Sequence, residues 1–204
     1  MKQGRILKDA LILFTITVLS GLILGGVHEF TKDRINNSSI SADLEAYKTV
    51  FPDAAEFKAD DKLTDALKKS NEELPSQNYG NVGLDQALQA VDKSGTVLGY
   101  VITSHSNDSY DGLVKILVGM NVDKTIKGIE MLELNDTPGL GQRAEEPEFK
   151  GQFAGKSGES LTVTKSGSAG DGEINAISGA TITSRAVTNA VNAALYLMNH
   201  NVEQ

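Results

Sequence analysis

The sequence predicts an α+β domain that follows a single N-terminal membrane helix. Three observations indicate this fold class: an uncharged apolar run over residues 10–27, β-branched runs separated by turns between residues 92 and 134, and apolar residues at helical spacing over residues 183–199. With 204 residues and 40% hydrophobic content, the chain can bury one core of ordinary domain size. We therefore expect one globular domain and one anchor.

The apolar run over residues 10–27, ALILFTITVLSGLILGGV, contains no charged residue. As a helix it would be about 27 Å long at ~1.5 Å per residue, which is close to the thickness of a bilayer core. A cleaved signal peptide is the alternative, but it has a shorter apolar region and small residues at its cleavage site, which residues 25–27 match poorly. We therefore assign residues 1–8 to a cytoplasmic N-terminus and residues 9–29 to a transmembrane helix.

Charge is distributed unevenly along the chain. The first 34 residues contain five basic and three acidic residues, which gives them a net charge of +2. Because the formal net charge of the whole chain is −8, the remaining 170 residues have a net charge of −10. By the positive-inside rule, Lys2, Arg5 and Lys8 keep the N-terminus in the cytoplasm, and the domain is then extracytoplasmic. The acidic domain argues against a nucleic-acid partner, because such a partner requires concentrated positive surface.

The chain contains no cysteine, which excludes several redox centres as properties of this chain. Iron–sulfur clusters, c-type haem and thiolate zinc all depend on cysteine ligands. The three histidines, His28, His105 and His200, have no spacing that brings two of them to one helix face, so we expect no metal site. Any redox centre is therefore held in another way.

Residues 30–91 are interpreted as a helical and variable connecting region. Apolar residues at helical spacing over residues 40–51 predict a short helix that ends before Pro52. The charged and polar stretch over residues 59–81 predicts a solvated insertion with one set of helical turns. We place the beginning of the globular domain at residue 92.

The domain over residues 92–204 begins with a turn at residues 92–95 and continues with short strands and a final helix. A second turn is expected around Asp123 and Lys124. Expected strands cover residues 96–103, 114–122, 126–134 and 161–164, and the amphipathic helix covers residues 183–199.

Residues 178–184, SGATITS, join an extended segment to the last helix and concentrate hydroxyl groups and small side chains there. The unpaired N–H groups of a first helical turn and the positive end of the helix dipole favour an anion such as a phosphate. The same residue types also form the ordinary N-cap pattern, so this segment alone is compatible with capping.

A second segment, DTPGLG at residues 136–141, forms a tight loop after an expected strand. Gly139 and Gly141 permit positive φ angles and a close approach of the backbone to a ligand. Taken alone, this segment is compatible with a simple turn.

Together the two segments resemble the FMN-binding domain family found in the G subunit of the Rnf electron-transport complex and in the C subunit of the sodium-pumping NADH:quinone reductase. In that family a TPGLG loop precedes an SGAT motif, as residues 137–141 precede residues 178–181 here. Tyr110-Asp111-Gly112 resembles the family's glycine turn, and the N-terminal span also matches. The resemblance covers nearly the whole chain apart from residues 59–81. It implies a single extracytoplasmic FMN-binding domain, and the compact length favours the Rnf type.

The resemblance implies that Thr181 carries FMN covalently, as an ester of the FMN phosphate. A separate flavin transferase is expected to attach it, because no His or Cys lies nearby in the sequence to activate the hydroxyl. By the same resemblance, Thr137 and Leu140 contact the ribityl chain and the isoalloxazine. The remaining cofactor-binding residues implied in this way are Ser178, Gly179, Ala180, Gly139 and Gly141.

Two further residues near the motif have open interpretations. Lys165 either offsets the phosphate charge or is a solvated lysine on a polar strand. Asn175 stands where the family usually has aspartate, three residues before the motif serine. If the transferase recognises that carboxylate, attachment to this chain is slower.

The implied function is that of a membrane-anchored electron-transfer subunit in an ion-translocating oxidoreductase complex of the cell membrane, with no catalytic residues of its own. Its partners would be other membrane subunits and iron–sulfur or flavin subunits of the same complex. The absence of a GxGxxG fingerprint argues against direct NADH oxidation, and an uncharged span offers no ion path. The alternative is a non-redox extracytoplasmic assembly or ligand-binding module in which Thr181 is unmodified.

Overall fold

The computed structural model describes residues 8, 10–21 and 44–202. The chain falls into two units, Met1–Leu44 and Glu45–Gln204. In the first unit, residues 10–21 are helical and exposed. Among the residues that the structure describes, no helix has the length and apolar character needed to cross a membrane. Residue 9 and residues 22–29 of the expected span lie outside the described residues.

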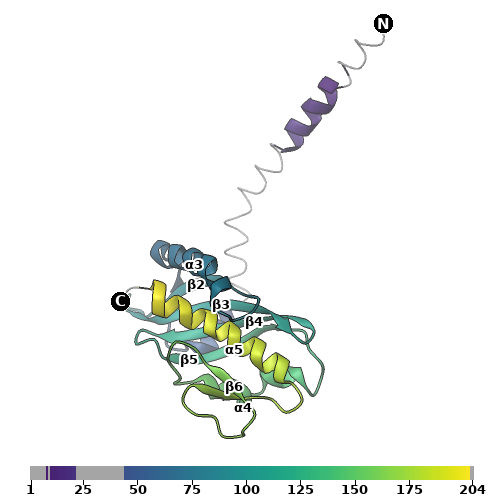
Figure 1. Cartoon of the computed structure of the whole chain (residues 1–204). Coiled ribbons are helices and arrows are strands. Elements are labelled where there is room, and N and C mark those ends of the chain that lie inside the picture. Colours follow the sequence, from purple (N-terminus) through teal and green to yellow (C-terminus); the bar gives the residue numbers. More distant parts are fainter. Residues whose placement is uncertain (1–7, 9, 22–43, 203–204) are drawn as a thin grey trace. The chain divides into compact units, whose positions relative to one another are not determined.

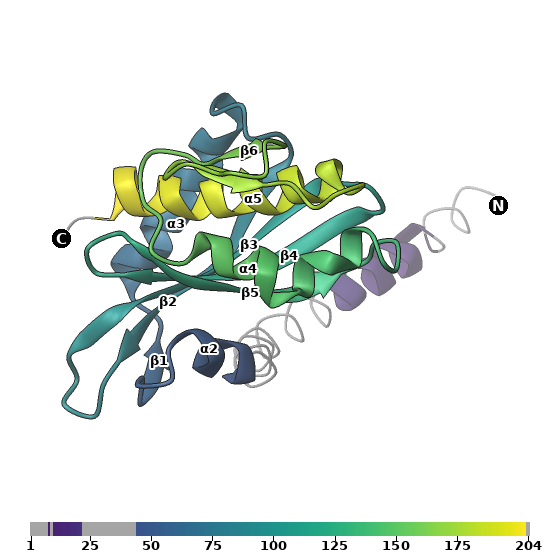
Figure 2. The ribbon, with the colours of Figure 1, turned by 90° about the horizontal axis from the view of Figure 1, so that it is seen from below.

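The second unit is built on a five-stranded antiparallel sheet in the order β1-β2-β3-β4-β5. Figure 1 labels β2 to β5, and Figure 2 also labels β1. Because strands that follow each other in the sequence are neighbours in the sheet, a turn suffices for each connection from β2 through β5. Two of these turns lie at residues 92–95 and around Asp123. The strands are β1 (Glu56–Lys58), β2 (Val82–Val91), β3 (Val97–Ser109), β4 (Gly112–Asn121) and β5 (Ile126–Leu134).

One face of the sheet is covered by α5 (Thr181–Tyr196), which continues into the π-helical turn η4 (Leu197–Asn201) (Figure 2). The Ser104 hydroxyl in β3 donates a hydrogen bond to the Ala190 carbonyl at 2.9 Å. Small and β-branched residues on α5 allow this close approach, and Val187, Ala190 and Val191 are completely buried. The main core therefore lies between α5 and the sheet.

The opposite face of the sheet is covered by α2 (Leu44–Val50) and Phe51. Val50 packs against Gly119 in β4 so closely that a Cβ at this position would overlap the Val50 side chain. Phe51 is completely buried at this contact. Glycine in the sheet thus lets a short helix lie directly on the backbone.

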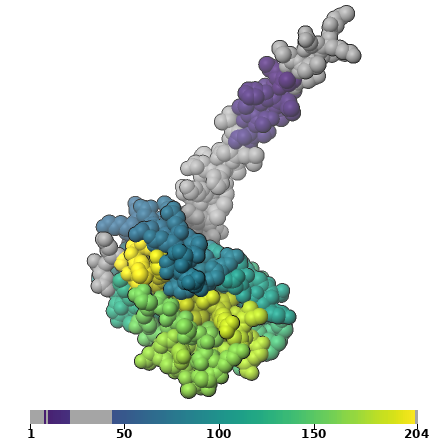
Figure 3. All heavy atoms as spheres, viewed as in Figure 1, coloured from purple at the N-terminus to yellow at the C-terminus, as the bar shows by residue number. Residues whose placement is uncertain are grey.

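The remaining elements surround α5 and the end of β5. They are α3 (Asp61–Glu73), η1 (Leu74–Ser76), η2 (Gly141–Glu145), α4 (Pro147–Lys150), η3 (Gly151–Phe153), and the parallel pair β6 (Thr162–Thr164) and β7 (Glu173–Asn175). Figure 3 shows α3 lying beside the C-terminal end of the chain.

The expected strands at residues 96–103, 114–122, 126–134 and 161–164 are confirmed as β3, β4, β5 and β6. The expected final helix is also confirmed, although α5 begins two residues earlier than residue 183. The helix expected over residues 40–51 corresponds to α2, and its residues 40–43 lie outside the described residues.

The helical turns predicted within residues 59–81 are confirmed as α3, but the prediction that this segment is a solvated insertion was wrong, because α3 packs against the core. Residues 61–73 form α3, whose first turn is capped by Asp60, which accepts a hydrogen bond from the Leu63 amide at 2.9 Å. Leu63 and Ala66 are buried. They form a narrow apolar stripe on a helix whose other residues are mostly charged or polar, which is why the sequence pattern did not indicate burial. The next segment also differs from the expectation: β2 is part of the sheet, whereas the sequence placed the beginning of the domain at residue 92.

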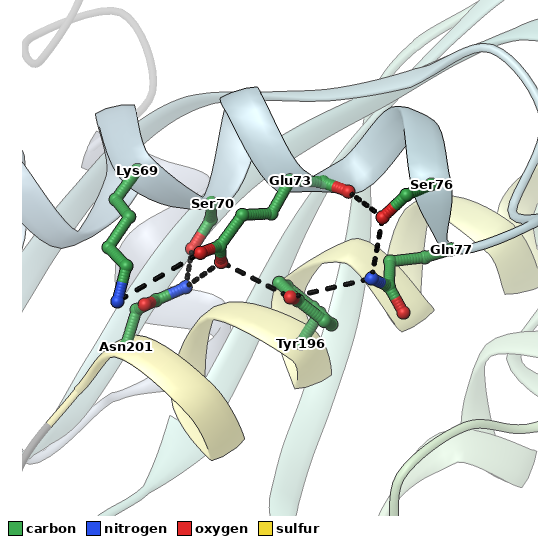
Figure 4. Close-up of polar contacts among 7 residues, drawn as sticks. All are labelled: Lys69, Ser70, Glu73, Ser76, Gln77, Tyr196 and Asn201. Carbon is green, nitrogen blue, oxygen red and sulfur yellow. Dashed lines mark hydrogen bonds and ion pairs between the residues drawn. The ribbon is translucent and has the colours of Figure 1, made fainter.

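A polar cluster joins α3 to the C-terminal end of the chain (Figure 4). The Glu73 carboxylate accepts hydrogen bonds from the Tyr196 hydroxyl at 3.1 Å and from Asn201 Nδ2 at 2.9 Å. Asn201 Nδ2 also donates to the Ser70 hydroxyl at 2.9 Å. The cluster therefore connects α3 to the helix that carries the candidate site.

We expect protonation of Glu73 in acid to lower the free energy of unfolding. Its pKa is lowered from 4.5, first by the hydrogen bond from Asn201 and then by the one from Tyr196. The stabilisation is fully present above pH 4.5, the value for the free side chain, and is lost as the pH falls through the lowered pKa. Thermal unfolding between pH 7 and pH 3 should show a flatter acid limb for Glu73→Gln than for wild type. Glu72→Gln, an exposed substitution on the same helix, should leave that limb unchanged.

Candidate functional site

A cavity of about 580 Å³ opens where the loop after β5 meets the N-terminus of α5. Six of the eight residues that the sequence assigned to a cofactor lie along its wall. The lining residues are Tyr110, Asp136, Thr137, Leu140, Gly141, Lys165, Gly179, Ala180, Thr181, Ile182 and Thr183. Gly139 and Ser178 belong to the same two segments but do not line the cavity.

The carboxylate of Asp136 joins the two segments. Its Oδ2 atom accepts hydrogen bonds from the hydroxyls of Thr183 at 2.6 Å and Ser109 at 3.1 Å. Its Oδ1 atom accepts from the Thr137 amide at 2.6 Å. Asp136 and Thr183 are only 7% and 1% exposed. The end of β3, the loop at residues 137–141 and the first turn of α5 therefore meet at one buried group.

Glycines allow the two segments to approach each other closely. A Cβ at Gly141 would overlap the carboxyl group of Asp136. Gly179 has a φ of +82°, and a Cβ there would lie 3.0 Å from Leu140 Cδ2. Gly139 has a φ of +76° in the turn that the Leu140 amide closes by donating to the Thr137 carbonyl at 3.1 Å.

The hydroxyl groups around the motif have different roles. Thr183 donates to Asp136, while Ser184 donates to the Ala180 carbonyl at 2.9 Å and accepts from the Ile177 amide at 2.9 Å. Thr181 is half-buried and lines the cavity, and its hydroxyl makes no hydrogen bond within residues 44–202. Ser178 is exposed outside the wall of the cavity. Within the first turn of α5, Thr181 thus presents the available hydroxyl; Thr137 on the same cavity wall also makes no side-chain hydrogen bond within residues 44–202.

The simple N-cap interpretation of this segment does not hold. Ala180 occupies the N-cap position of α5, and no side chain caps the helix there. The first backbone hydrogen bond of the helix runs from the Ser184 amide to the Ala180 carbonyl at 3.0 Å, which leaves the amides of residues 181–183 to other acceptors. The first turn contains no acidic residue, and Lys165 adds a positive charge to the wall. The Asp136 carboxylate lines the same wall, where it accepts three hydrogen bonds. The free amides and Lys165 together suit an anionic group.

Three apolar side chains on the cavity wall are unusually exposed. Tyr110, Leu140 and Ile182 are 71%, 44% and 50% exposed. Such side chains can contact the faces and edges of a planar aromatic ligand. The cavity therefore combines apolar surface with free backbone amides and Lys165.

Sequence reasoning gave Asp136, Ile182 and Thr183 no role in the site, although they lie in its two segments, and it treated Tyr110 only as part of a turn. An available signal was Ile182, a large apolar residue at the second position of the helix, outside the apolar stripe that faces the core. The Asp136 bridge had no local signal, because its partners are remote in sequence.

Asn175 lies in β7, just before the motif. Its amide donates to Gln152 Oε1 at 2.7 Å, and its carbonyl accepts from Gln152 Nε2 at 3.3 Å. Its side-chain Oδ1 is buried without a hydrogen-bond partner among the residues described. The backbone before the motif is therefore held by Gln152 and not by the Asn175 side chain.

Comparison with known proteins identifies relatives along nearly the whole chain. The family model described as FMN-binding domain matches residues 109–196. The G subunit of the Na(+)-translocating ferredoxin:NAD(+) oxidoreductase complex of Acetobacterium woodii is 32% identical over 197 residues, covering 93% of this chain and 90% of the relative. The G subunit of the ion-translocating oxidoreductase complex of Methanosarcina acetivorans is 30% identical over 194 residues, covering 94% and 93%.

Among solved structures, the crystal structure of Shewanella oneidensis NqrC is similar to this chain with a TM-score of 0.47 and 23% identity. The match covers 55% of this chain and 58% of that one. The relatives in the preceding paragraph match over nine-tenths or more of both chains, and the family model includes both cavity segments. The chain belongs to the family of the G subunits of ion-translocating oxidoreductase complexes, which has an FMN-binding domain.

Proposed function

We propose that this chain is a membrane-anchored electron-transfer subunit of an ion-translocating oxidoreductase complex and holds FMN covalently through Thr181. The observation that carries the proposal is the available Thr181 hydroxyl at the uncapped N-terminus of α5, inside the cavity. Attachment forms a bond between Thr181 Oγ1 and the flavin-side phosphorus of FAD. The bond to AMP breaks, and the transferase accepts the hydroxyl proton.

The residues of the cavity fit FMN at both ends. The amides of residues 181–183 and the Lys165 ammonium would bind the phosphate ester, which retains a negative charge. Thr137 would contact the ribityl chain, and Leu140 and Tyr110 would contact the isoalloxazine. When bound, FMN supplies reversible electron transfer, and the protein supplies its position and surroundings.

The proposed membrane topology rests on the sequence. Residues 9–29 would anchor the chain, and Lys2, Arg5 and Lys8 would keep the N-terminus cytoplasmic. A covalent bond is useful to an extracytoplasmic domain, because a dissociating cofactor would be lost where free FMN is scarce. Other membrane subunits and iron–sulfur or flavin subunits of the same complex would exchange electrons with this chain and translocate the ion.

The proposal is tested on full-length protein purified from its native membrane. Covalent FMN predicts in-gel flavin fluorescence after denaturation and an intact mass about 440 Da above that of the chain. An unmodified mass with flavin released on denaturation would contradict the covalent bond but retain a flavoprotein. An unmodified mass without any flavin would favour the non-redox module.

Leu140→Ala should change the environment of the flavin with little change in stability. Leu140 is 44% exposed, so its truncation should alter the free energy of unfolding by only about 0.5 kcal/mol. The loss of an apolar wall should expose the isoalloxazine, which is measured as stronger iodide quenching of flavin fluorescence. Val122→Ala truncates another side chain that is 44% exposed, away from the cavity wall, and should leave quenching unchanged. Equal quenching in the two variants would remove Leu140 from the proposed site.

A further inference from the structure

The buried carboxylate of Asp136 is placed to control how Thr181 is presented. We infer that Asp136 is a positioning residue for flavin attachment: it holds the first turn of α5, through Thr183, against the loop at residues 137–141. This inference rests on the proposed function and adds a residue that acts on Thr181 indirectly.

The first turn of α5 is held on two sides. On one side, the Thr183 hydroxyl donates to Asp136 at 2.6 Å. On the other, the Ser184 hydroxyl bonds both the Ile177 amide and the Ala180 carbonyl, which fixes the segment before the helix. Thr181 lies between these two attachments with its own hydroxyl available. Its position relative to the cavity is therefore set by its neighbours.

The same carboxylate fixes the loop that forms the facing wall. Asp136 Oδ1 accepts from the Thr137 amide at 2.6 Å, and Gly141 packs so closely that a Cβ would overlap the carboxyl group. Ser109 adds a third donor from the end of β3. A movement of either segment thus requires breaking hydrogen bonds to a buried carboxylate, which are stronger than those between neutral groups.

Positioning matters because the transferase must bring FAD to a poorly nucleophilic hydroxyl. Small displacements of a reacting group lower rates steeply, and about 1 Å can cost roughly a hundredfold. Removing the Thr183 hydroxyl should release the first turn from Asp136 without altering Thr181 itself. We therefore expect slower attachment from a chain that remains folded.

The test compares Thr183→Val with Thr188→Val. Both threonines are 1% exposed on α5, but the Thr188 hydroxyl donates to the Ser184 carbonyl at 2.8 Å and not to Asp136. Full-length protein made without the transferase is incubated with FAD and the transferase, and the initial rate of attachment is followed by in-gel fluorescence and intact mass. Thr183→Val should be about tenfold slower than wild type. Thr188→Val should retain the wild-type rate, and Thr183→Ser, which keeps the hydroxyl, should restore most of it.

Equal rates for Thr183→Val and Thr188→Val would overturn the inference. A double-mutant cycle with Asp136→Ala adds a second criterion, because residues that act as one unit give non-additive losses. Additive losses would indicate that Asp136 and Thr183 act independently, which also contradicts the inference.

The inference and the proposed function can fail separately. If wild-type protein gains no mass, covalent attachment fails, and amide hydrogen exchange of the unmodified chain then decides the role of Asp136. The inference expects Thr183→Val to accelerate exchange at the Thr137 and Leu140 amides, 46 and 43 positions away, while Thr188→Val does not. Unchanged exchange at both amides in Thr183→Val would contradict it.

Discussion

Thr181→Ala is expected to eliminate covalent flavin completely while the domain remains folded. The variant lacks the oxygen atom that forms the ester, so no partial modification at this position is possible. The side chain is half-buried and makes no hydrogen bond within residues 44–202, and alanine is favourable in a helix. The free energy of unfolding should therefore change by about 0.5 kcal/mol or less.

The other hydroxyls of the first turn of α5 should not replace that of Thr181. Thr183 is 1% exposed and bonded to Asp136, and Ser184 is buried with two hydrogen bonds. Thr181→Ser retains a hydroxyl and should remain a substrate for attachment. In-gel fluorescence of Thr181→Ala, Thr181→Ser and wild type, normalised to protein and accompanied by thermal unfolding, measures both properties. Fluorescence remaining in Thr181→Ala would contradict the assignment of this residue.

Gly141→Ala is expected to be the most destabilising single substitution in the loop at residues 137–141. The new Cβ would overlap a carboxyl group that cannot move freely, because three hydrogen bonds hold it. Overpacking costs about 1–3 kcal/mol, and weakening of the Asp136 hydrogen bonds adds to this, so we expect a loss of about 3 kcal/mol. For a domain of this size, the melting temperature should fall by roughly 10 °C.

Gly151→Ala is the matched control for Gly141→Ala. Both glycines lie at the beginning of a 3-10 helix, but a Cβ at Gly151 has no neighbour within 4 Å. Its φ of −62° also suits alanine. Gly151→Ala should therefore change the melting temperature by no more than a few degrees. Equal melting temperatures in the two variants would show that the Asp136 carboxyl group is not tightly held.

Sequence reasoning predicted those parts of the fold that depend on local patterns. In the hairpin between β2 and β3, the Asp92 carboxylate accepts hydrogen bonds from the Ser94 and Thr96 amides at 2.7 and 2.9 Å. A turn of this kind is recognisable from its residue types. The strands after it have β-branched residues and clear ends. The C-terminal helix has a broad apolar face, so the helical spacing of its apolar residues could be recognised in the sequence.

The parts that were missed or only partly predicted depend on tertiary contacts. In α3, charged residues outnumber the few apolar positions, so burial of Leu63 and Ala66 against the core decides its structure. In β2, glutamine and aspartate alternate irregularly with apolar residues, and pairing with β3 on one side and β1 on the other decides it. Long-range pairing of this kind is not encoded by local propensity.

In the candidate site, too, the parts with local sequence patterns were predicted and the parts that depend on tertiary contacts were not. Its two segments were singled out by their glycine and hydroxyl residues, which permit close approach to a ligand, and they were assigned to FMN through the resemblance to the FMN-binding domain family. Their contact through Asp136 requires Ser109 and Thr183, residues on either side of it that lie 27 and 47 positions away. No short-range pattern predicts such a meeting point, so it became visible only in the folded chain.

The most direct test of the central claim is to locate the flavin by tandem mass spectrometry of trypsin-digested protein from the native membrane. Cleavage after Lys165 and Arg185 yields one peptide, residues 166–185, that contains Thr181 together with Ser178, Thr183 and Ser184. We predict an added mass of about 440 Da on this peptide, with fragment ions that place it on Thr181. A peptide of unmodified mass, or an added mass placed on another residue, would contradict the assignment of Thr181 as the site of covalent FMN.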